Sequence, residues 1–191
     1  AIHKAFYGLP NVDVVALADP LAEPRAERAA EVGNPKEYDD YRDMLAAEQP
    51  DLVAICPHHF EHHGRWLLEV IASGVKGIYI EKPITASLEE ADAVVAAADA
   101  AGTKIAVAHQ NRYRPGMRHI RDLVRNGDLG TLKYMNAMGK CDKRGGTHDL
   151  RVLGTHLLDA LRFIKSQIQL TEKNQQKDLD EPGVIEVIAK Q

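Results

Sequence analysis

The chain has 191 residues, a formal net charge of −4 and a sequence pI near 6.1. Hydrophobic residues make up 45% and charged residues 27%, which is typical of a globular protein of one or two domains. The acidic balance argues against a nucleic-acid partner, and the apolar runs are too short for a membrane span. Cys56 and Cys141 are too few and too far apart for a disulfide framework, which predicts a reduced, cytoplasmic setting.

Short apolar runs alternate with longer segments of helix-forming residues over the first half of the chain. Strands are predicted at 12–18, 51–56, 77–80 and 104–108. Helices are predicted at 23–32, 41–48, 62–73 and 88–101, the last after a capping box that begins at Ser87. This alternation predicts an α/β fold, a Rossmann-like doubly wound parallel sheet with ligands at the carboxyl ends of its strands.

The pattern changes after His109. The sequence predicts a helix at 115–126, a strand at 131–138, a glycine-rich loop at 140–147 and an amphipathic helix at 149–164. We therefore expect one domain over residues 1–109 and the start of an α/β substrate domain over 110–164. Residues 165–191 lack arginine and form an atypical tail, either a solvated linker or sequence foreign to the preceding domain.

Dinucleotide-binding folds begin with a strand, a G-x-G-x-x-G turn and a helix whose N-terminus receives the pyrophosphate. That glycine-rich turn is absent, and residues 1–9 look like the end of the first helix. We therefore expect a chain truncated at its N-terminus, without the first strand and the glycine-rich turn, and lacking most of the second domain. Whether an export signal precedes Ala1 is open.

Asp19 follows the first predicted strand and is a candidate cofactor-binding residue. A carboxylate there can accept hydrogen bonds from both ribose hydroxyls of an adenosine, and it repels a 2′-phosphate. Because Pro20 follows it instead of an arginine, the sequence favours NAD over NADP. The alternative is an Asx turn before Pro20.

The run Glu81-Lys82-Pro83 ends the third predicted strand. A lysine at the carboxyl end of a strand can donate to a substrate oxygen and stabilise charge that develops during hydride transfer. Partial burial would lower its pKa toward acid–base work. The alternative is a surface turn with a salt bridge.

Several of these features recur together in a fixed order. They are Asp19 after a strand, Pro57 with His62 shortly after it, A-S-G-V-K-G-I-Y-I-E-K-P at 72–83, R-Y-R-P at 112–115 and G-T-H-L-L-D at 154–159. In this combination the chain resembles the glucose–fructose oxidoreductase / inositol dehydrogenase / MocA family of NAD(P)-dependent oxidoreductases over residues 1–164.

The resemblance implies a Rossmann domain followed by an α/β domain that carries the substrate face and often the oligomer contacts. It implies that Pro57, His62 and Glu81 lie at the cofactor, that Lys82 lies at both cofactor and substrate, and that His156 is the acid–base residue. The substrate would be a sugar, a polyol or a related cyclic alcohol, and the full-length protein would be a candidate homo-oligomer.

A helix over 149–164 would place Asp149, Val152, His156 and Asp159 close to one stripe. A carboxylate bonded to one ring nitrogen of His156 would leave the other nitrogen for proton transfer. The family usually has an aspartate where Val152 stands, so Asp149 is either its substitute or a helix N-cap. His148 is a second candidate for the acid–base group.

Arg112 and Tyr113 are candidate substrate contacts, with interdomain packing as the alternative. The run from His58 to His63 has the i,i+4 histidine spacing that can hold zinc on a helix. A third ligand is not evident, so the sequence predicts no metal. The alternative is that one or two of these imidazoles line the nicotinamide cleft.

Two functions remain open at this stage. The first is an NAD(P)-dependent oxidoreductase acting on CH–OH groups. The second is a non-catalytic family member, truncated and without effective cofactor binding.

Overall fold

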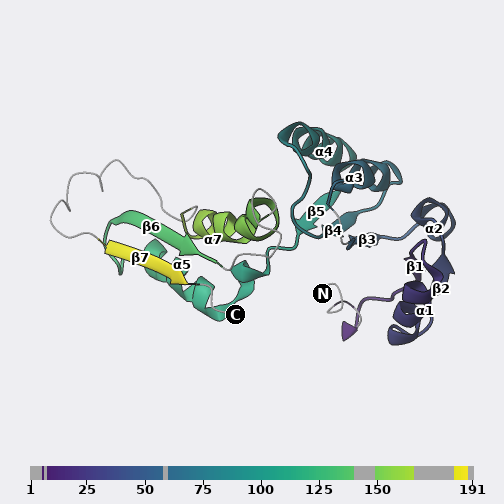
Figure 1. Cartoon of the computed structure of the whole chain (residues 1–191), viewed down its shortest axis with the longest axis horizontal. Coiled ribbons are helices and arrows are strands. Elements are labelled where there is room, and N and C mark those ends of the chain that lie inside the picture. The colour runs from purple at the N-terminus through teal and green to yellow at the C-terminus, as the bar shows by residue number, and fades with distance from the viewer. Residues whose placement is uncertain (1–5, 7, 58–59, 140–148, 166–182, 189–191) are drawn as a thin grey trace. The chain divides into compact units, whose positions relative to one another are not determined.

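The structure is a computed structural model that describes residues 6, 8–57, 60–139, 149–165 and 183–188 (Figure 1). The chain divides into two compact units, residues 1–108 and 109–191. Over the described ranges, none of the helices combines the length and the apolar character that crossing a membrane requires.

The first unit alternates strands and helices (Figure 1). Its strands are β1 (Ala16–Ala18), β2 (Lys36–Tyr38), β3 (Leu52–Ile55), β4 (Gly77–Ile80) and β5 (Lys104–Val107). Its helices are α1 (Ala22–Glu31), α2 (Tyr41–Glu48), α3 (His63–Ala72) and α4 (Leu88–Ala101). β1 pairs in parallel with β2, and β3, β4 and β5 form a parallel sheet in that order. Parallel strands joined by helices confirm the predicted α/β fold class.

Local signals in the sequence set most of these boundaries. The Ser87 hydroxyl accepts a hydrogen bond from the Glu90 amide at the start of α4, and Gly102 ends that helix with a φ of 73°. Two details were wrong or missed. β1 begins at Ala16 instead of at residue 12, and β2 was not predicted because two of its three residues are exposed and leave no apolar pattern.

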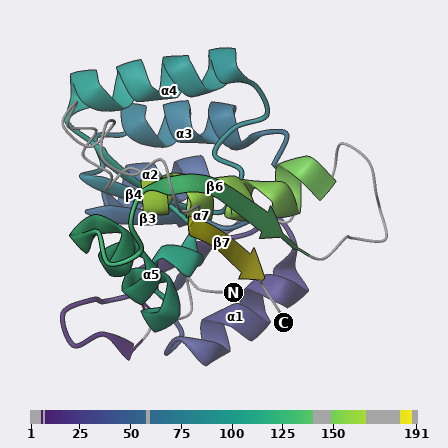
Figure 2. The same ribbon diagram turned by 90° about the vertical axis from the view of Figure 1, so that its left-hand side faces the viewer.

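The core of the first unit lies between the β3–β4–β5 sheet and the helices α2, α3 and α4. α3 and α4 run side by side in both views of the molecule (Figure 2). Leu67 of α3, Ile80 of β4 and Val94 of α4 are fully buried in this core. Their burial removes apolar surface from water and fixes the ends of β3 and β4, where the candidate residues lie.

The second unit contains a short 3₁₀ helix, η2 (Gln110–Tyr113), the helices α5 (Pro115–Asn126) and α7 (Thr155–Lys165), and the parallel strands β6 (Leu132–Met138) and β7 (Gly183–Ile188). Met117, Ala160 and Ile164 form its small core. A π-helical turn, η3 (Leu150–Gly154), precedes α7. The predicted continuous helix over 149–164 is therefore corrected to a π turn followed by an α-helix. β7 lies in the tail and was not predicted, and the predicted loop at 140–147 lies outside the described residues.

Candidate active site

Asp19 lies directly after β1 and is half-buried. Its amide donates to the Tyr38 carbonyl at 3.1 Å, which extends the pairing of β1 with β2 by one bond. One carboxylate oxygen accepts from the Leu21 amide at 2.8 Å, so the Asx turn proposed as an alternative is present. Within the described part of the chain the second oxygen accepts no hydrogen bond. The turn therefore orients the carboxylate and leaves one oxygen to accept from a ligand.

Arg25 of α1 packs beside this turn, and its side chain is 14% exposed. Its Nη1 donates to the Asp19 carbonyl and pairs with Asp39 at 2.6 Å. Its Nε donates to Glu37 at 3.2 Å. The guanidinium thus lies within hydrogen-bond reach of the Asp19 backbone, and two carboxylates hold it there.

The run Glu81-Lys82-Pro83 follows β4, as the sequence predicts. The Glu81 amide donates to the Ile55 carbonyl at 3.0 Å, so the first residue after β4 is fixed to the end of β3. The bond between Lys82 and Pro83 is cis. Glu81 and Lys82 are both half-buried at the carboxyl end of the sheet.

The first turn of α3 holds this segment through His63, which belongs to the histidine run but was not among the predicted site residues. His63 is 1% exposed, and its Nδ1 lies 2.7 Å from the Pro83 carbonyl. A carbonyl only accepts, so Nδ1 carries the proton. Burial lowers the pKa of His63, which keeps the ring neutral and leaves Nε2 as a bare acceptor. Nε2 is buried and has no hydrogen-bond partner among the described residues.

His62, which the resemblance placed at the cofactor, is exposed and lies before the first residue of α3. Its ring makes an edge contact with Trp66, with the ring centroids 5.6 Å apart. The apolar spacing of α3 indicates which histidine is buried, because His63 precedes Leu67, Val70 and Ile71 by four, seven and eight residues. That periodicity was available in the sequence.

Cys56 and Pro57 lie just beyond β3 and are half-buried. Burial, and then the charge of Glu81, raise the pKa of Cys56 to about 12. The same two causes, with a smaller contribution from Cys56, raise the pKa of Tyr79 to about 12. Both groups are therefore protonated at neutral pH, and the Cys56 thiol is no nucleophile.

In the second unit His156 lies in the first turn of α7. The rings of His109 and His156 meet edge to face, with centroids 5.6 Å apart and planes at 89°. His109 precedes η2 and was missed, because only the packing of η2 against α7 brings the two imidazoles together. Asp149 precedes the π turn, whose wider winding invalidates the stripe drawn from a regular α-helix.

Arg112 and Asp159 form a salt bridge within the second unit. The Arg112 Nε donates to the two carboxylate oxygens of Asp159 at 2.9 and 2.8 Å, and Nη2 also donates to it. The hydrogen bonds that Arg112 donates to Asp159 raise the pKa of Arg112. Asp159, which the sequence placed on the same helix face as His156, thus accepts its hydrogen bonds from Arg112. Tyr113 is 69% exposed and lies under the Arg118 guanidinium at 5.6 Å.

The described ranges contain no group of three or more histidine, cysteine or acidic residues that could hold a metal ion. His58 and His59 lie outside those ranges. The expectation that the chain holds no metal therefore stays a prediction.

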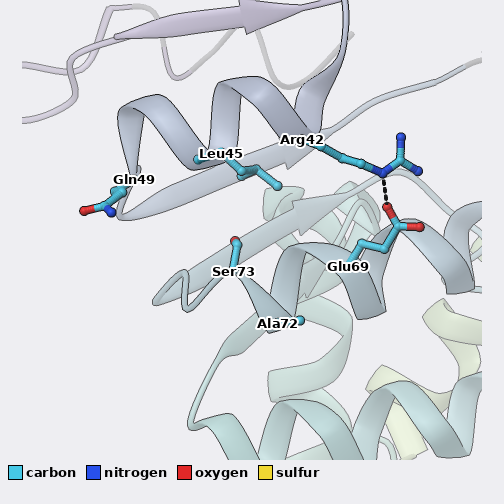
Figure 3. A pocket seen from close by; sticks show the side chains of 7 residues that line it. Arg42, Leu45, Gln49, Glu69, Ala72 and Ser73 are labelled. Carbon is cyan, nitrogen blue, oxygen red and sulfur yellow. Dashed lines mark ion pairs between the residues drawn. The ribbon is translucent and has the colours of Figure 1, made fainter.

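A groove between α2 and α3 contains none of the predicted site residues (Figure 3). On one side of it Glu69 accepts from Arg42 at 2.8 Å, from Arg65 at 2.7 Å and from the Tyr41 hydroxyl. These bonds lower the pKa of Glu69 to about 2, while burial and Glu69 raise the pKa of Tyr41 to about 12. The network is a stable ion-pair cluster without a group that titrates near neutral pH.

Residues 1–109 match the model of the oxidoreductase family with an NAD-binding Rossmann fold (GFO_IDH_MocA). The chain belongs to this family. It is 28% identical to a D-apiose dehydrogenase of Paraburkholderia graminis over 84% of the chain and 45% of that protein. It is 27% identical to a D-glucoside 3-dehydrogenase of Escherichia coli over 85% of the chain and 50% of that protein.

Solved structures agree with the fold. An NAD-binding oxidoreductase from Klebsiella pneumoniae superposes with a TM-score of 0.71 and 26% identity, over 84% of this chain and 46% of that one. A putative NADPH-dependent oxidoreductase from Desulfitobacterium hafniense gives 0.73 and 21%, over 85% and 50%. The chain spans about half the length of the curated relatives it matches. The first unit is thus a Rossmann-type α/β domain.

Proposed function

We propose that this chain belongs to an NAD-dependent oxidoreductase that transfers a hydride between nicotinamide and an alcohol carbon of a sugar, a polyol or a related cyclic alcohol. The family supports the reaction class. The names of the D-apiose, D-glucoside and inositol dehydrogenases among its relatives support the substrate class. The observation that supports the choice of NAD as cofactor is the half-buried Asp19 carboxylate at the end of β1. One of its oxygens is bonded to the Leu21 amide, and the other is available to accept from a ligand.

The residues present fit the adenosine end of a dinucleotide. The Asp19 carboxylate would accept from ribose hydroxyls, and the Asx turn with Leu21 holds its orientation. The cations nearby in sequence are engaged: Arg25 pairs with Glu37, and Lys36 pairs with Glu48 at 2.9 Å. The 2′-phosphate of NADP would therefore lie close to the Asp19 carboxylate, and neither of these two cations would be available to neutralise it. This supports NAD over NADP.

When bound, NAD supplies or accepts the hydride. Lys82 would donate a hydrogen bond from its ammonium group to the reacting substrate oxygen and stabilise its negative charge. His156 would take the hydroxyl proton during oxidation and return it during reduction. Asp149 remains our candidate for orienting His156. Glu81 and Pro57, with Lys82, would line the cofactor at the ends of β3 and β4.

We assign different roles to the two units. Residues 1–109 would bind the cofactor, and residues 110–164 would begin the substrate domain, with Arg112 and Tyr113 on the substrate side. The Asp159 salt bridge makes Arg112 a support for that surface, whereas the exposed Tyr113 is available to a polyol. A homo-oligomer and a cytoplasmic setting remain predictions from the sequence.

Calorimetric titration with NAD and NADP tests the cofactor proposal on a protein of the relatives' length that contains these residues. We expect NAD to bind more tightly. Asp19→Asn keeps an acceptor for the Leu21 amide but loses the charge, so NAD affinity should fall about tenfold. Asp43→Asn, in the first turn of α2, is the control and should change affinity less than twofold. Tighter binding of NADP than of NAD by the unchanged protein would refute the assignment of Asp19.

Kinetics test the catalytic roles. Lys82→Ala and His156→Ala should each lower kcat by about 10²–10⁴-fold and leave the Kd for NAD within threefold. The matched controls are Lys76→Ala, before β4, and His119→Ala, on an exposed position of α5. Unchanged turnover in both test variants would refute the site. A full-length protein that binds NAD but turns over no sugar or polyol would favour the non-catalytic alternative.

A further inference from the structure

The segment from β1 to the start of α2 carries an unusual charge pattern. Residues 19–40 hold seven carboxylates and three cations, a formal charge of −4 that equals the charge of the whole chain. Each of the three cations is paired in the structure: Arg25 with Glu37 and Asp39, Arg28 with Glu31, and Lys36 with Glu48. The segment that contains Asp19 therefore presents paired cations and excess negative charge.

Arg25 differs from the other two cations in its position. Its Nη1 bonds to the backbone carbonyl of Asp19, the residue proposed to bind the ribose. Glu37 lies in β2 in register with Leu17, and Asp39 is the first residue after β2, as Asp19 is the first after β1. The two carboxylates thus hold an arginine beside Asp19, the residue that the proposed function assigns to the adenosine ribose.

We propose that Glu37 and Asp39 are specificity-determining residues, which keep Arg25 from serving as a 2′-phosphate ligand and so maintain the preference for NAD. The inference rests on the proposed cofactor function. An arginine near the adenosine ribose is the usual means of accommodating the 2′-phosphate of NADP. Arg25 has the required charge and reach, but its Nε and Nη1 donors are directed at carboxylates.

Substituting the two carboxylates should release Arg25 from them. Glu37→Gln and Asp39→Asn keep the size and the acceptor oxygens of both side chains but remove the charges that compete with phosphate for the guanidinium. A phosphate carries up to two negative charges and accepts bidentate bonds from arginine more strongly than a neutral amide does. The released Arg25 would therefore turn from these side chains to the ligand.

The test is the ratio of the Kd for NADP to the Kd for NAD, measured by calorimetry on the full protein that carries these residues. In the double variant Glu37→Gln/Asp39→Asn the ratio should fall about tenfold, the effect of one charge-assisted hydrogen bond. Adding Arg25→Gln to the double variant should restore the ratio. Asp39→Glu, which keeps the carboxylate, should leave it unchanged.

Net charge is controlled by Glu27→Gln/Glu31→Gln, which removes two charges from α1 but leaves both partners of Arg25. This variant should shift the ratio less than twofold. The inference is refuted if the two double variants shift the ratio equally, or if the shift survives removal of Arg25. Should the double variant fail to fold, Asp39→Asn alone serves, because that side chain is 84% exposed.

The outcomes separate this inference from the proposed function. If the unchanged protein binds neither dinucleotide, the proposed function fails. If it binds NAD and the ratio does not respond to Glu37 and Asp39, only the role of these two residues fails.

Discussion

Each unit of the chain contains an arginine bonded to one or two carboxylates near a predicted site residue, and the carboxylates of these two clusters differ in burial. In the second unit Arg112, whose side chain is 43% exposed, bonds to one carboxylate, Asp159, which is 6% exposed. In the first unit Arg25, whose side chain is 14% exposed, bonds to two carboxylates, Glu37 and Asp39, which are 39% and 84% exposed.

The difference decides what each cluster can do. A buried carboxylate without its cation has a large desolvation cost, so the Arg112 pair is structural. Glu37 and Asp39 are exposed and remain solvated with or without a partner, so we expect their bonds to the largely buried Arg25 to contribute less to stability than the Arg112 pair does. We expect substitutions of Glu37 and Asp39 to leave the fold intact, which would allow this cluster to set specificity.

The largest expected effect is on the Arg112 pair, whose carboxylate is buried. Arg112→Leu leaves the Asp159 carboxylate without a cation, and we expect it to lower the free energy of unfolding by about 3 kcal/mol. Most of the loss should persist in 1 M NaCl, because salt screens a buried charge weakly. Denaturant unfolding at low and high salt measures both quantities.

The control for this prediction is Asp122→Asn, which breaks the partly exposed pair of Asp122 with Arg121 on α5. It should cost less than about 0.5 kcal/mol. The double variant Arg112→Leu/Asp159→Leu should recover part of the loss, since it buries no unpaired charge. An equal cost for Arg112→Leu and for the control would show that burial does not distinguish the two clusters.

His63 extends the comparison of buried and exposed contacts to a side chain that is buried but neutral. Replacing it with alanine removes a packed ring and the bond to the Pro83 carbonyl, at a cost of about 2–3 kcal/mol. His62→Ala, at the exposed neighbour, should cost less than about 0.5 kcal/mol. Denaturant unfolding at pH 7 compares the two.

The pH dependence gives His63 a second signature. Its pKa is lowered in the folded state, mainly by burial, so the unfolded chain binds the proton more readily below about pH 6.5. Stability should therefore fall as the pH drops from 7 to 5, by up to about 1.4 kcal/mol per pH unit from this group. His63→Gln should have a shallower slope than the unchanged protein, and parallel slopes would contradict the assignment.

The sequence predicted the elements well wherever local signals act. The capping serine of α4, the glycines after helices and the apolar strands fixed most bounds of the first unit to within one or two residues. The burial of His63 also follows from helical periodicity, although His62 was the predicted site residue. β2 was missed because a three-residue strand with an exposed face has no periodicity to detect.

The rest of the candidate site depends on tertiary contacts that no local pattern encodes. Asp19 and Arg25 are six residues apart, but the carboxylates that hold Arg25 come from later in the sequence. Glu37 lies in β2, and Asp39 directly follows it. His109 and His156 are separated by a helix and a strand, and their rings meet only because η2 packs against α7. The π turn before α7 is likewise invisible to an argument that assumes 3.6 residues per turn.

The smallest expected effect is on the Arg25 cluster, whose carboxylates are exposed. Substitutions there should change the cofactor preference but have little effect on stability. Arg25→Gln should lower the free energy of unfolding by less than about 1 kcal/mol, and most of that loss should disappear in 1 M NaCl. Arg28→Gln, which breaks the i,i+3 pair with Glu31, is the matched control on the same helix and should cost about 0.3 kcal/mol. A loss above 2 kcal/mol that salt does not reduce would make the Arg25 cluster a structural element like the Arg112 pair. In that case the two clusters would be equivalent, and a change in cofactor preference after altering Glu37 or Asp39 would reflect a distorted β1–β2 edge instead of a released arginine.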